Sequence, residues 1–124
     1  MIGKFGLAVA ALLISAAPAL ADSCGGDPVA PAAVDGSKAT EQQMKDAIAD
    51  FKTFQAASDD YQQCLVNDLH RQEAEAAKAK DPKPLDPSIQ QGVDAKVSAN
   101  QRLKEKVAGE LNAAIVAYKQ NHKS

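Results

Sequence analysis

The stretch DPKPLDP at residues 81–87 divides this chain of 124 residues into two segments and decides its fold. Three prolines so close together cannot continue an α-helix, because proline lacks a backbone N–H and its ring clashes with the preceding turn. Residues 40–80 contain neither proline nor glycine. A short connection between helices usually makes them antiparallel neighbours. The sequence therefore predicts a helix over 40–80, a loop over 81–87 and a second helix over 88–120.

Apolar or small residues recur at steps of three and four on both sides of this loop, which is typical of helices with one buried face. We therefore predict an all-α fold over residues 40–121, a long antiparallel two-helix hairpin with a coiled-coil-like seam. Capping boxes are expected at both helix starts, formed by Thr40 with Gln43 and by Ser88 with Gln91. The predicted structural core consists of Phe51, Phe54, Tyr61, Leu65, Leu103, Val107, Leu111 and Tyr118.

Folding the two stripes together around the loop predicts which residues face each other. In this register Leu65 faces Leu103, Ser58 faces Leu111 and Leu69 faces Asn100. Ser58 could instead cap a new helix, which would give three helices, but the stripe keeps its phase there and favours one continuous helix. Gly109 interrupts the second helix, either as a tolerated defect or to allow close approach of another backbone.

The first residues resemble an export signal. Lys4 precedes an apolar run over residues 5–17 that is too short to span a bilayer, and Ala19 and Ala21 suit signal peptidase. We predict a signal peptide over residues 1–21, cleaved after Ala21, and a periplasmic or secreted protein without a transmembrane anchor. In an oxidising compartment Cys24 and Cys64 are expected to form a disulfide, within one chain or between two.

Residues 22–39 are rich in proline, glycine and alanine and lack periodicity, so we predict an extended arm. Such an arm is long enough to run back along the first helix to Cys64. Val29, Val34 and the prolines would then cover the aromatic half of the hairpin as a third layer. A homodimer, in which two hairpins form a four-helix bundle, would be a second source of stability.

Composition and motifs favour a protein that works by contact. The net charge of −2, or −3 without Lys4, argues against binding to nucleic acid. His70 and Glu73 lie one helical turn apart, as in some metal sites, but the predicted register offers Asn100 and Gln101 instead of further ligands. We expect no catalytic residue, no metal and no cofactor, and hence no enzyme. The leading hypothesis is a non-enzymatic adaptor, chaperone-like protein or inhibitor with an unknown protein partner; the alternative is a small-ligand or metal carrier formed as a dimeric four-helix bundle.

Overall fold

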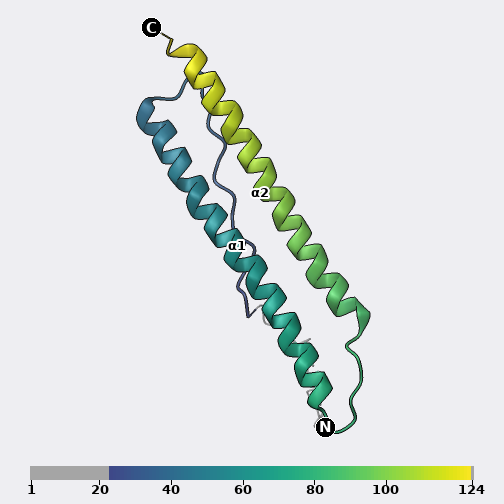
Figure 1. Cartoon of the computed structure of the whole chain (residues 1–124). Coiled ribbons are helices and arrows are strands. Elements are labelled where there is room, and N and C mark those ends of the chain that lie inside the picture. Colours follow the sequence, from purple (N-terminus) through teal and green to yellow (C-terminus); the bar gives the residue numbers. More distant parts are fainter. Residues whose placement is uncertain (1–22, 124) are drawn as a thin grey trace, which may run out of the picture.

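The computed structural model describes residues 23–123, which form two long helices packed against each other and an extended arm (Figure 1). Helix α1 spans Glu41–Lys78 and helix α2 spans Pro87–Asn121, and the described residues contain no strand. The predicted all-α hairpin is therefore confirmed. The predicted signal peptide over residues 1–21 lies outside the described part of the chain. Neither α1 nor α2 contains a stretch apolar enough to cross a membrane.

Helix α1 begins as the sequence predicts. The Thr40 hydroxyl accepts a hydrogen bond from the Gln43 backbone N–H at 3.1 Å, and the Gln43 side chain accepts one from the Thr40 N–H at 2.9 Å. These two bonds satisfy donors that a helix start otherwise leaves without a partner. Glu41 in the first turn pairs with Lys45 at 2.7 Å.

Helix α2 begins differently, so the predicted capping box of Ser88 with Gln91 is wrong. Asp86 is the N-cap, and its carboxylate accepts the Ser88 backbone N–H at 2.9 Å. Pro87 takes the first helical position, where its fixed φ is favourable and its missing N–H costs nothing. The hydrogen bond from the Ser88 N–H also lowers the pKa of Asp86.

Helix α1 runs without interruption through Ser58, so the alternative with three helices is wrong. Ser58 is fully buried between the helices, and its hydroxyl accepts a hydrogen bond from Asn100 Nδ2 at 3.3 Å. Gln62 Nε2 in turn donates to Asn100 Oδ1 at 2.8 Å and to Gln101 Oε1 at 3.2 Å. Ser58 therefore makes a polar contact between helices instead of starting one.

The observed register differs from the predicted one by about two to three helical turns. Asn100 lies opposite Ser58 and Gln62 instead of Leu69, and Lys104 of α2 pairs with Asp59 of α1. The apolar stripe of each helix repeats about every seven residues, so sliding one helix along the other by two turns again brings apolar residues together. The hydrophobic pattern alone therefore does not select the register. The observed register pairs the buried Ser58 and Asn100 with each other. As a result α2 begins above the end of α1, and the loop climbs back to reach it (Figure 1).

Replacing Asn100 by alanine is expected to destabilise the protein by about 1–2 kcal/mol, because the buried Ser58 hydroxyl loses its partner and the Gln62 amide keeps only its hydrogen bond to Gln101. Asn112→Ala makes the same change at an exposed position of α2 and should have almost no effect. Urea unfolding of both variants measures the difference. Equal midpoints would show that the polar contact between the helices contributes nothing.

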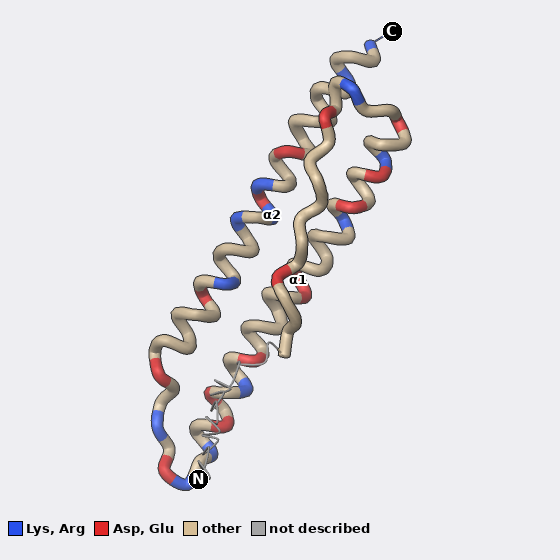
Figure 2. The backbone as a smooth tube through the Cα atoms, turned by 180° about the vertical axis from the view of Figure 1, so that it is seen from behind, with Lys and Arg blue, Asp and Glu red and all other residues tan. Residues whose placement is uncertain are grey.

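The arm runs along the groove between α1 and α2 and covers the half of the hairpin away from the loop (Figures 1 and 2). Pro28, Pro31 and Val34 are half-buried against the helices, whereas the side chain of Val29 is 89% exposed. The expectation that Val29 covers the core is therefore wrong. Pro28, Pro31 and Val34 are spaced three residues apart. This spacing is the period of a polyproline II chain, which turns every third side chain to the same side.

The closest approach of the arm to a helix occurs at Gly36, which is buried. A Cβ atom there would lie 1.8 Å from the carbonyl oxygen of Ala114 in α2. A Cβ atom at Gly109, in contrast, would meet nothing within 4 Å, so the arm does not approach this glycine, and close approach of a second subunit there stays a prediction. Gly36 is the glycine that lets a second backbone pack against α2.

The core is concentrated under the arm. Ala39, Met44 and Ala114 form one cluster, against which Val34 and Tyr118 pack. Between residues 70 and 99 no residue is buried. The loop half of the hairpin is therefore thin and open. Of the predicted core residues, the buried ones are Phe54, Tyr61, Leu65 and Val107, and the half-buried ones are Phe51, Leu103, Leu111 and Tyr118.

Candidate binding groove

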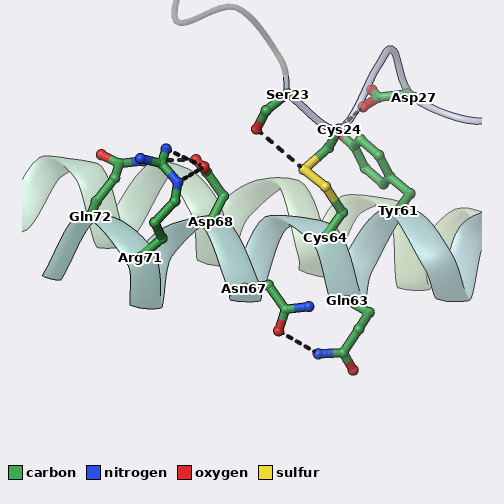
Figure 3. The surroundings of a disulfide bond; sticks show 10 residues. All are labelled: Ser23, Cys24, Asp27, Tyr61, Gln63, Cys64, Asn67, Asp68, Arg71 and Gln72. Carbon is green, nitrogen blue, oxygen red and sulfur yellow. Dashed lines mark hydrogen bonds and ion pairs between the residues drawn. A yellow bond between two sulfur atoms is a disulfide. The ribbon is translucent and has the colours of Figure 1, made fainter. Parts of the chain in front are cut away.

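The N-terminal part of the arm is bonded covalently to the middle of α1. A disulfide joins Cys24 to Cys64 within one chain, with a Cα–Cα distance of 5.6 Å (Figure 3). One turn before Cys64, the buried Tyr61 donates its hydroxyl hydrogen to the carboxylate of Asp27 in the arm. These two links hold the arm over the aromatic half and fix the point where it leaves the helices.

Past Cys24, toward the loop, α1 and α2 line a further space that the described residues of the arm do not cover. This open space, which we call the loop groove, has a volume of about 480 Å³. Its α1 wall runs from Leu65 to Glu75, its α2 wall runs from Ser88 to Lys96, and Ser23 and Cys24 close the end next to the disulfide. The loop groove thus lies between the same two helices as the arm and begins beside the first described residues of the arm.

The floor of the loop groove is apolar and lacks bulk. Leu65 is buried, while Ile89 and Val93 are half-buried. Gly92 adds no side chain to the α2 wall, and a Cβ atom placed there would meet nothing within 4 Å. Within residues 23–123, apolar side chains of both helices therefore line a space that no other side chain fills, and Gly92 contributes to this space by adding no bulk.

The α1 rim is charged, and its charges pair with each other. Arg71 contacts Asp68 at 2.6 Å and Glu75 at 2.8 Å, and Gln72 Nε2 donates to the second carboxylate oxygen of Asp68 at 2.8 Å. The hydrogen bonds from Arg71 and Gln72, with a smaller contribution from the Ser23 hydroxyl, lower the pKa of Asp68. The Asp68 carboxylate and the Arg71 guanidinium thus point toward each other along the outer side of α1 (Figure 3).

The polar residues singled out in the sequence lie in different places. Asn100 lies between the helices, and Gln72 lies in the wall of the loop groove. His70 and Glu73 are both exposed on α1. Within residues 23–123 no three His, Cys, Asp or Glu side chains are arranged to hold a metal ion.

Sequence reasoning missed the loop groove itself. The available signal was the composition of residues 72–97, where alanine, glutamine and glycine replace the large apolar residues of the other half. Small side chains on two facing helices leave a gap, but only the position of the arm shows which part of that gap stays open.

In chemical terms the loop groove offers an apolar floor with polar groups at its rim, a composition typical of sites that bind apolar ligands or chain segments. Its walls are helices, whose backbone groups are already hydrogen-bonded within each helix. Recognition there would depend on side-chain contact and shape. Comparison with known proteins finds no matching family model, no similar curated protein and no similar solved structure.

Proposed function

We propose that this protein is an exported, non-enzymatic binding protein that holds a partner in its loop groove. The observation that supports this proposal is that the described arm covers only one half of the hairpin. The arm fills the space between the helices as far as Cys24 and leaves about 480 Å³ of apolar-floored groove beyond it. Leaving such surface exposed lowers stability, and uncovered apolar surface often marks an interaction site.

The remaining structure suits a rigid binding surface. The disulfide fixes one end of the loop groove, and the paired charges of the α1 rim hold their side chains in place. A groove ordered in advance loses less conformational entropy on binding than a mobile one. The disulfide is also compatible with the periplasmic or secreted location that residues 1–21 predict.

Site-specific photo-crosslinking in the living host tests this proposal. A photoreactive amino acid replaces Ser88, whose side chain lies at the groove, or Asn112, which is exposed in the other half of α2. We expect a discrete adduct from position 88 and none from position 112. No adduct from position 88, or the same adduct from both positions, would contradict the proposal.

A pair of glycine variants makes this experiment specific. Gly92→Leu places a large side chain in the loop groove, whereas Gly109→Leu places the same side chain on an open part of α2 outside it. Both changes replace a helical glycine and should stabilise the helix to a similar extent. The adduct from position 88 should disappear in Gly92→Leu and persist in Gly109→Leu.

A small-ligand carrier is the second candidate, and the volume of the loop groove favours it, because pockets for small molecules usually measure about 300–1,000 Å³. The groove is open on one side, so a second copy would have to close it to form a four-helix bundle. Light scattering on protein purified from its host tests this reading, together with native mass spectrometry. A dimer with a bound small molecule supports a carrier, and a ligand-free monomer rules it out.

A further inference from the structure

We infer that the partner enters the loop groove as an extended peptide segment rich in proline, alanine and valine, lying in line with the arm of this chain. This inference rests on the proposed function and specifies the chemistry of its partner. The loop groove and the part of the hairpin under the arm lie between the same two helices, and Cys24 of the arm lines the end of the groove where the two parts meet. What the hairpin already binds in one half therefore indicates what it binds in the other.

The arm shows how a chain segment occupies this channel. Its residues 28–34 read PVAPAAV, carry no charge and are extended. Pro31 and Val34 contact a small gap whose other walls are Phe51 of α1 and Leu111 of α2. Pro28, Pro31 and Val34 are half-buried against the helices, and Ala32 and Ala33 line the same gap, so small side chains keep the backbone of the arm close to the surface.

The walls of the loop groove favour the same type of segment. A helix has no free backbone edge, so an incoming peptide cannot be added to it as a β-strand. A polyproline II segment makes no internal backbone hydrogen bonds, and proline has no N–H that would lose its partner on binding. Its preformed shape also lowers the entropy lost on binding. The apolar floor of Leu65, Ile89 and Val93 offers contacts for proline, alanine and valine side chains.

The length of the loop groove sets the length of the segment. From Leu65 to Glu75 the α1 wall measures about 15 Å at 1.5 Å per residue. A polyproline II chain advances about 3.1 Å per residue, so about five residues fill this distance. Asp68, Arg71 and Glu75 on the α1 rim pair with one another, so a segment without acidic or basic residues can lie beside them without breaking these ion pairs.

The probe for this inference is a synthetic peptide with the sequence of residues 28–34, Pro-Val-Ala-Pro-Ala-Ala-Val, blocked at both ends. It is titrated into the mature protein and followed by NMR at the methyl groups. We expect shifts at Ile89 and Val93 in the loop groove and not at Val107 or Leu111 under the arm. A control peptide in which Pro28, Pro31 and Val34 are replaced by serine should cause no shifts.

The glycine pair again provides matched variants. Gly92→Leu should weaken binding of the peptide at least tenfold, and Gly109→Leu should leave it unchanged, although both variants fold. Equal binding to the two variants, or shifts confined to Val107 and Leu111, would overturn the inference.

The outcomes separate this inference from the proposed function. If the peptide does not bind but the crosslinker at Ser88 still gives an adduct of another mass, the loop groove binds a partner of different chemistry and the inference is wrong. An adduct of twice the chain mass would identify a second copy as the occupant and would also overturn it. No adduct and no peptide binding would contradict the proposed function itself.

Discussion

Replacing Cys24 or Cys64 by serine is expected to destabilise the protein by about 3–4 kcal/mol. The bond between these residues closes a loop with a sequence separation of 40, and a crosslink of that span restricts the unfolded chain by about this amount. For a domain of this size the melting temperature should fall by roughly 15–25 °C. Thermal unfolding followed by circular dichroism measures the change.

The matching controls use the same measurement. Because both single variants break one bond, the double variant should be no less stable than either of them. Lys83→Ala in the loop should leave the melting temperature almost unchanged, since Lys83 and its partner Asp81 are both well exposed. Comparable losses in Lys83→Ala and Cys64→Ser would show that the arm does not stabilise the hairpin.

Gly36→Ala is expected to have the second largest effect, a loss of about 2–3 kcal/mol. A Cβ atom at Gly36 would lie 1.8 Å from the carbonyl oxygen of Ala114 and 2.6 Å from its carbonyl carbon. These are backbone atoms of a helix, which cannot move aside as a flexible side chain can. The arm must therefore shift away from α2 and separate Val34 from the cluster around Met44. Thermal and urea unfolding would both show the loss.

Gly26→Ala is the matched control, because it makes the same change in the same arm where nothing lies within 4 Å. Its melting temperature should equal that of the unaltered protein or rise slightly, since alanine restricts the unfolded chain more than glycine does. Equal stability of the two variants would mean that the arm does not pack against α2 at Gly36.

The parts of the fold that the sequence predicts depend on local signals. The prolines of residues 81–87 end one helix and begin another, and Thr40 with Gln43 marks the start of α1. Each of these signals acts within a few residues, where sterics and hydrogen bonding leave few choices. That Cys24 and Cys64 form a disulfide could be predicted as well, because an expected export signal makes a disulfide the usual state of two cysteines, but the sequence left open whether it forms within one chain.

The register and the loop groove could not be predicted because both depend on contacts between distant residues. Shifting α2 by two turns keeps an apolar face against α1, and only the pairing of Ser58 with Asn100 distinguishes the alternatives. The loop groove lies past the point where Cys24 is bonded to Cys64, in the part of the hairpin that the described residues of the arm do not cover. No single stretch of sequence contains that information.

The position of the arm is the central claim, since it determines both the stability of one half of the hairpin and the open groove in the other. Nuclear Overhauser effects in the mature protein test it most directly. We predict contacts from Gly36 to Ala114 and from Val34 to Met44, and none between the arm and Ile89 or Val93. Contacts from residues 28–36 to Ile89 or Val93, with none to Ala114, would contradict the account.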